Sequence, residues 1–142
     1  MDILVPVDQT NASRVAAREA LSKAESLDAT VVFTHCIADT PNVEDDIISY
    51  DLGEAEENGE AIINDMRELS TEYDVRGAIF DIVREDDVVQ GILSEIDARS
   101  PDFVFIGHRN IAGWDQPVAS TAKRLIKESP VPVTVVTPEN GG

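Results

Sequence analysis

The chain has 142 residues, 42% of them hydrophobic, and its 28 Asp and Glu residues against 11 Lys and Arg residues give a formal net charge of −17. This length fits one domain and this hydrophobic content supports a buried core, so we expect neither a second domain nor intrinsic disorder. Such an acidic surface repels nucleic acid and anionic lipid, so we expect neither of them as a partner. No apolar run approaches the roughly 20 residues of a membrane span, so we expect no membrane-spanning helix.

Cysteine usage and lysine scarcity predict the compartment. Cys36 is the only cysteine, which excludes an intrachain disulfide and a cysteine-built zinc site. The opening residues lack a basic stretch followed by an apolar one, so we expect no signal peptide and a cytoplasmic location. The only lysines are Lys23, Lys123 and Lys127. Few lysines among many acids are typical of a high-salt cytoplasm, where the Debye length falls to about 3 Å at about 1 M salt. We therefore predict a halophilic protein.

Short apolar runs alternate with helical patterns along the chain. Continuous apolar runs, typical of strands covered on both faces, span residues 3–7, 31–35, 78–83, 103–106 and 131–136. Between them, apolar residues spaced three or four apart predict helices over residues 17–27, 62–73, 89–96 and 118–126. We expect the first helix to be capped by Thr10, Asn11 or Ser13 and the third to begin through Asp86 and Asp87, and we expect fraying over residues 137–142.

This alternation predicts a single α/β domain over residues 1–142. Strands joined by helices form right-handed crossovers, so we expect a doubly wound, five-stranded parallel sheet with helices on both faces. In such sheets, ligands bind in the crevice at the carboxyl ends of the strands. Functional residues are therefore expected directly after the strands.

Missing motifs exclude several enzyme classes. The chain has neither G-x-x-x-x-G-K-[ST] nor G-x-S-x-G, which excludes a P-loop NTPase and a nucleophile-elbow hydrolase. The turn after the first strand, residues 8–11, reads DQTN and lacks the glycines of dinucleotide-binding folds. No positioned base or nucleophile stands out, so we expect no enzymatic activity.

A metal site is also not expected. His35 and Cys36 are adjacent in a predicted strand, so their side chains point to opposite faces and cannot easily share a metal. We expect His35 to be a strand-end residue whose polar tip is hydrogen bonded. Cys36 is expected to be a small buried hydrophobic residue.

Two positions at the predicted crevice carry chemical interest. Asp8 directly follows the first strand, where its carboxylate can face a ligand, cap the next helix, or both. Residues 107–110, Gly-His-Arg-Asn, leave the fourth strand, and Ala119, Ser120 and Thr121 follow within the last helical segment. A glycine turn that leads to a helix start can present backbone N–H groups and hydroxyls to phosphate.

Three segments resemble, in order, the opening, fourth and closing strands of the universal stress protein family. They are ILVPVD at residues 3–8, DFVFIG at residues 102–107 and SPVPVTVV at residues 129–136. The resemblance covers nearly the whole chain and implies the strand order 3-2-1-4-5. It also implies a homodimer formed through the final strands, and a crevice that binds ATP in some family members but not in others.

The ATP-binding members resemble G-x-x-G-x9-G-[ST], and this chain departs from that pattern. Gly107 matches the first glycine, but Asn110 stands at the second. Counting back from the closing strand puts Ala119 at the third glycine and Ser120 at the hydroxyl, whereas counting forward from Gly107 puts Ser120 and Thr121 there. Asn tolerates a left-handed turn, but an alanine methyl group intrudes where a phosphate approaches the backbone.

The resemblance therefore implies a set of candidate nucleotide-binding residues: Asp8, Val32, Gly107, Asn110, Ala119, Ser120 and Thr121. Asp115, in the loop between them, adds a negative charge that a divalent cation such as Mg²⁺ would have to offset. We favour a non-enzymatic stress-response or regulatory protein whose degenerate crevice need not hold a nucleotide. The alternative is a switch that binds ATP with Mg²⁺ and hydrolyses it at most very slowly.

The closing strand also predicts a partner. Pro130 and Pro132 cannot donate ladder hydrogen bonds, so this strand suits the edge of a sheet. Val131, Val133 and Val135 make that edge apolar, and a bare apolar edge invites aggregation. Because a two-fold mate would cover it, we predict a homodimer formed through the last strand.

Overall fold

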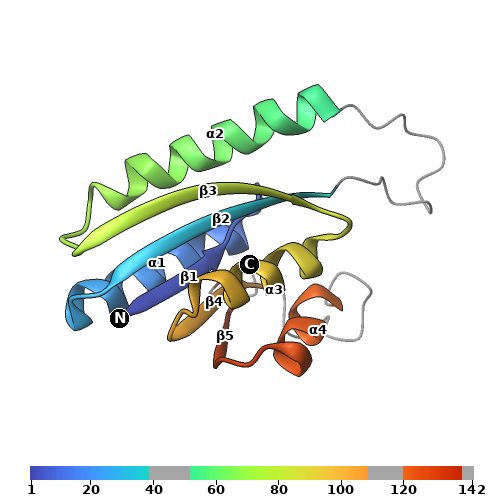
Figure 1. The fold of residues 1–142 in the computed structure, drawn as a ribbon. Coiled ribbons are helices and arrows are strands. Elements are labelled where there is room, and N and C mark those ends of the chain that lie inside the picture. Colours follow the sequence, from blue (N-terminus) through green and yellow to red (C-terminus); the bar gives the residue numbers. More distant parts are fainter. Residues whose placement is uncertain (39–51, 109–119, 139–142) are drawn as a thin grey trace.

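The computed structural model describes residues 1–38, 52–108 and 120–138, in which strands and helices alternate (Figure 1). The elements are β1 (Asp2–Pro6), α1 (Asn11–Leu27), β2 (Thr30–Ala38), α2 (Leu52–Ser70), β3 (Gly77–Glu85), α3 (Val88–Arg99), β4 (Phe103–Gly107), α4 (Ser120–Glu128) and β5 (Val133–Val136). All neighbouring strands are parallel, in the order β3-β2-β1-β4-β5. The predicted doubly wound α/β fold and its strand order are confirmed.

The sheet is covered on both faces, which explains the continuous apolar runs. Successive strand residues point to opposite faces, so Ile3 packs with α1 and α2 whereas Leu4 packs with α3 and α4. Both side chains are fully buried. The same alternation on β2 sends Val31 and Val32 into the two opposite cores.

The helix starts follow the predicted caps, and two stripe residues depart from prediction. Thr10 caps α1 and Asp87 caps α3, each accepting a hydrogen bond from a backbone N–H three residues on. Leu27 and Ile126, however, are 44% and 48% exposed. Leu27 is the last residue of its helix, and the short α4 buries a narrow stripe, so neither side chain reaches the sheet.

β1 and β4 differ from their predicted bounds by at most one residue at either end, and the other three strands differ by two or more. β2 and β3 each extend to nine residues because they pair with each other along their whole length. β5 is shorter and begins after Val131, whose backbone is held in a turn by two hydrogen bonds with the Ser129 hydroxyl, at 2.8 and 3.1 Å. The ladder with β4 starts where the Pro132 carbonyl accepts from the Val104 N–H.

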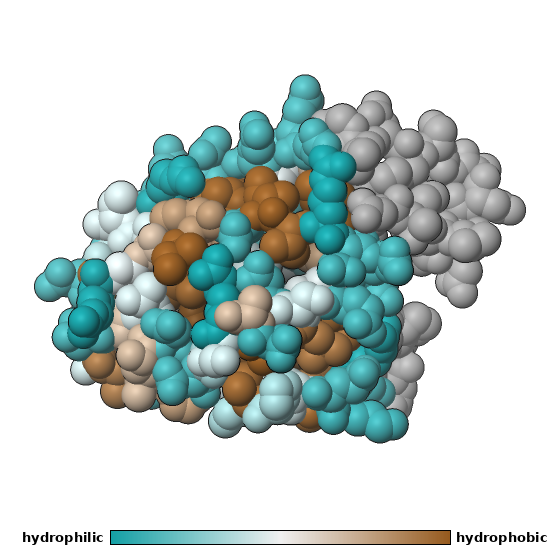
Figure 2. Space-filling model, viewed as in Figure 1, coloured by the Kyte–Doolittle hydropathy of each residue, from teal (hydrophilic) through white to brown (hydrophobic). Residues whose placement is uncertain are grey.

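The two edges of the sheet are β5, as predicted, and β3. Val133 and Val135, together with Val131 before the strand, pack against the core beneath α3 and α4. Along β3, Ile79 and Ile82 are 40% and 37% exposed, and Figure 2 shows hydrophobic surface where this strand crosses the visible face. Among the helices of the described ranges, none has the length and apolarity needed to cross a membrane.

Candidate functional site

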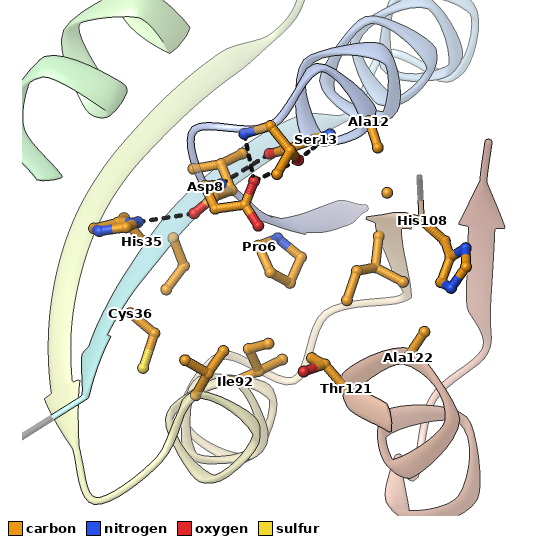
Figure 3. A pocket seen from close by; sticks show the side chains of 16 residues that line it. Pro6, Asp8, Ala12, Ser13, His35, Cys36, Ile92, His108, Thr121 and Ala122 are labelled. Carbon is orange, nitrogen blue, oxygen red and sulfur yellow. Dashed lines mark hydrogen bonds between the residues drawn. The ribbon is translucent and has the colours of Figure 1, made fainter. Parts of the chain in front are cut away.

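A cavity of about 500 Å³ opens at the carboxyl ends of β1, β2 and β4, between the sheet and the first turns of α3 and α4 (Figure 3). This is the crevice at which parallel sheets bind ligands. The described residues that line it come from the ends of β1, β2 and β4 and from the starts of α1, α3 and α4. They are Pro6, Val7, Asp8, Thr10, Ala12, Ser13, Thr34, His35, Cys36, Val88, Ile92, Ile106, Gly107, His108, Thr121 and Ala122.

Asp8 stands at the rim of the cavity and organises the start of α1. Its Oδ1 accepts hydrogen bonds from the Thr10 N–H at 2.8 Å and the Thr10 hydroxyl at 2.6 Å, while its own N–H donates to the Ser13 hydroxyl at 2.9 Å. Thr10 is therefore the cap, and Asp8 orients the cap. Among the described residues Oδ2 has no partner, and it faces the cavity (Figure 3).

Gly107 ends β4 directly against the first turn of α1. A Cβ at this position would lie 2.2 Å from the Ala12 carbonyl oxygen and 2.7 Å from the Ser13 nitrogen, which no side chain permits. The next residue, His108, is 5% exposed, and its N–H donates to the Val136 carbonyl. The turn after Ile106 therefore lies beside Asp8, as the predicted crevice requires.

The start of α4 supplies the opposite wall. Thr121, in the first turn of this helix, lines the cavity, and its hydroxyl points inward in Figure 3. Ser120 is the first residue of α4, while Asn110, Ala119 and Asp115 lie outside the described residues.

The contribution of β2 differs from the predicted one. Val32 is buried in the core beneath α3 and does not line the cavity. Thr34 and Cys36, two and four residues further along the same face, line it instead. Thr34 and Cys36 replace Val32 because β2 runs three residues past its predicted end and the cavity lies at the carboxyl end of the strand.

His35 and Cys36 point to opposite faces, as predicted. His35 Nδ1 donates to the Val7 carbonyl at 2.9 Å, and its ring lies against Gly59 of α2. Cys36 lies against Gly91 of α3, on the other face, and is partly exposed rather than fully buried. Within residues 1–38, 52–108 and 120–138, no group of three or more His, Cys, Asp or Glu side chains is placed to hold a metal ion.

Within the described residues, the cavity lining is acidic and polar rather than basic. Asp8 is acidic, and none of the described lining residues is Lys or Arg. Thr10, Ser13, Thr34 and Thr121 add hydroxyl groups to the same lining.

This chain resembles known proteins in both sequence and structure. A model of the universal stress protein family matches residues 1–137, whereas no functionally curated protein matches significantly. Three solved structures illustrate the likeness. A universal stress protein family member from Burkholderia pseudomallei is 24% identical, with a TM-score of 0.72 and coverage of 95% of this chain and 94% of that one. UspA from Lactobacillus plantarum is 19% identical, with a TM-score of 0.75 and coverage of 96% and 97%. A family protein from Arabidopsis thaliana, with AMP bound, is 17% identical, with a TM-score of 0.68 and coverage of 99% and 98%.

At these identities the solved structures show a shared fold, and the family model adds membership because it spans almost the entire sequence. The segments that suggested the resemblance also meet in space, since Asp8 and Gly107 both line the cavity and β5 lies beside β4. On sequence and fold together, this chain belongs to the universal stress protein family.

Proposed function

We propose that this protein is a non-enzymatic regulatory protein that binds an adenine nucleoside monophosphate in the cavity at the carboxyl ends of β1, β2 and β4. The observation that carries the proposal is the cavity itself, because a space of about 500 Å³ is already formed and lies within the usual range for small-molecule sites. The formed cavity supports a crevice that holds a nucleotide, whereas the sequence favours a crevice that need not hold one.

Similar proteins supply the ligand class. The Arabidopsis thaliana structure holds AMP, and two further neighbours in this fold are complexes with cAMP and with dAMP. Each of these ligands combines one adenine base with one phosphate group. An apolar slot followed by hydroxyls and a helix start suits that combination.

Charge favours one phosphate over three. The cavity is lined by Asp8 and, among the described residues, by no Lys or Arg, on a chain whose net charge is −17. At 4 Å and an effective dielectric constant of 20, one pair of like charges repels by about 4 kcal/mol. ATP brings more negative charge than AMP, so it would need Mg²⁺ to bind as well.

The site chemistry supports binding without turnover. Asp8 Oδ1 is held by Thr10 and His35 Nδ1 by the Val7 carbonyl, and we assign both side chains to holding the fold and the ligand rather than to catalysis. We place the protein in the cytoplasm, as a homodimer paired through β5, in which the bound nucleotide alters what the dimer presents to its partners.

Calorimetric titration in concentrated KCl tests the proposal. AMP is expected to bind one site per chain, more tightly than ATP without Mg²⁺, and to raise the melting temperature. A ligand at about one hundred times its dissociation constant adds about 2.7 kcal/mol to the free energy of unfolding. Absence of both heat and a melting shift at millimolar AMP would refute nucleotide binding.

A matched pair of variants places the ligand. Thr121→Asp adds a negative charge where the phosphate is expected and should weaken AMP binding at least tenfold, about 1.4 kcal/mol. Ser94→Asp adds the same charge on the exposed side of α3, away from the lining, and should leave the affinity unchanged. Equal effects of the two substitutions would mean that the nucleotide binds elsewhere.

A further inference from the structure

Thr34 carries a buried hydroxyl that has no hydrogen-bond partner within the described parts of the chain. The residue is 1% exposed and lines the cavity. Native proteins pair nearly all their buried polar groups, and those left unpaired call for an explanation. A valine at this position would have the same shape without the unpaired oxygen, so the fold alone gives no reason for a hydroxyl beside the cavity.

The surroundings of Thr34 suit a flat base. Pro6 and Ile92 line the same cavity, and Ile92 is 1% exposed. Thr34 shares its sheet face with Cys36, which also lines the cavity. An apolar slot with a few polar groups fixes the orientation of an aromatic ligand through those polar groups.

The strand order places the parts of a nucleotide. Thr34 lies on β2, Asp8 follows β1, and Gly107 ends β4, and these strands are neighbours in the order β2-β1-β4. The phosphate belongs at the β4 side, beside the start of α4 and away from the Asp8 carboxylate. The ribose hydroxyls then meet Asp8, which accepts hydrogen bonds, and the base reaches β2.

We propose that Thr34 selects the base, its hydroxyl forming a hydrogen bond with one group on the edge of the adenine ring. This inference rests on the proposed nucleotide binding and adds the residue that recognises the base. Oγ1 is out of reach of solvent in the structure, so the proposed contact requires Thr34 to change from one staggered χ1 rotamer to another, which exchanges the hydroxyl and the methyl group. A hydroxyl can donate or accept, so either a ring nitrogen or the amino group can be its partner.

Two substitutions test this role against a structural one. Thr34→Val should weaken AMP binding about tenfold, while the melting temperature of the free protein stays the same or rises, because an unpaired buried hydroxyl is removed. Thr34→Ser keeps the hydroxyl and should bind AMP within about threefold of the wild type. A residue with only a structural role would lower the melting temperature and leave affinity alone.

Analogues of AMP identify the contact. Four probes each lack one edge group: 1-deaza-AMP, 3-deaza-AMP, 7-deaza-AMP and the purine nucleotide without the 6-amino group. One of them should bind the wild type as weakly as Thr34→Val binds AMP, and should lose nothing further in that variant. The role of Thr34 is refuted, while nucleotide binding stands, if the wild type and Thr34→Val bind AMP equally well. The same holds if Thr34→Val lowers the affinity for all four analogues by the same factor. If the wild type binds no AMP, the inference and the proposed function fail together.

Discussion

Gly107 and Ala12 touch backbone to backbone, with room for a hydrogen but not for a methyl group between β4 and the first turn of α1. Gly107 therefore serves the packing of α1 against the sheet, whatever it contacts in the cavity. Gly107 matches the first glycine of the family's ATP-binding pattern, and close packing against α1 is a further reason for a glycine at this position.

Replacing Gly107 with alanine is expected to destabilise the fold by about 1–3 kcal/mol or more, because backbone atoms cannot yield as a side chain can. Gly77→Ala is the matched control, since its Cβ would lie 3.4 Å from the Thr30 hydroxyl, with no backbone atom in the way. Urea unfolding of both variants measures the difference. Equal stabilities would show that α1 shifts freely away from β4.

Gly91 and Cys36 should be energetically coupled. A Cβ on Gly91 would lie 2.1 Å from the Cys36 sulfur, so Gly91→Ala forces that side chain out of its place. Alanine otherwise favours a helix over glycine by about 1 kcal/mol. We expect Gly91→Ala to destabilise the wild type and to be neutral or stabilising when Cys36→Ala is also present. A double-mutant cycle measured by urea unfolding gives the coupling energy, and simple additivity would contradict the predicted clash.

Salt should stabilise this protein strongly. The net charge of −17 repels itself in dilute buffer, and the Debye length falls from about 10 Å at 0.1 M to about 3 Å at 1 M salt. The melting temperature is expected to rise by about 5 °C or more across that range of KCl.

The exposed acids Glu19, Glu57, Glu60 and Glu68 provide the control for salt effects other than charge screening. Changing all four to glutamine should raise the melting temperature in dilute buffer and flatten its dependence on KCl. A wild type and a quadruple variant with the same salt dependence would argue against repulsion as the cause.

Pairing through β5 predicts a dimer that one charge can break. Thr134 is exposed on this four-residue edge strand. A glutamate there would be buried against a second copy, so Thr134→Glu should yield monomers in sedimentation experiments where the wild type is dimeric. Ser94→Glu, on the exposed side of α3, should remain dimeric. A monomeric wild type would count against this assembly.

The fold could be predicted from the sequence because its signals are local and repeated. Runs such as residues 3–7 and 31–35 are apolar without alternation, which is what two covered sheet faces require. Strand ends were harder to predict, since β2 continues to Ala38 only because β3 pairs with it there. That pairing is a tertiary fact with no local signature.

The candidate site could be predicted in outline and not in its β2 wall. Asp8 and Gly107 each follow or end a strand, so the crevice rule finds them. Thr34 looks like an ordinary strand residue in the sequence, and its place in the cavity lining becomes visible only once the strand order and the cavity are known. Val32 and Thr34 are two residues apart, which puts both side chains on one face of β2. This spacing is the feature of the sequence from which Thr34 could have been predicted as a lining residue.

The hydrogen bonds that Thr10 donates to Asp8 link the cavity to the first turn of α1. One carboxylate oxygen anchors the first turn of α1 and the other faces the space where a ligand would sit. Anything that engages the second oxygen must change how firmly that turn is held. Ligand binding in the cavity should therefore change the rate of amide hydrogen exchange at residues 11–13, which can be measured without a label on the protein or the ligand.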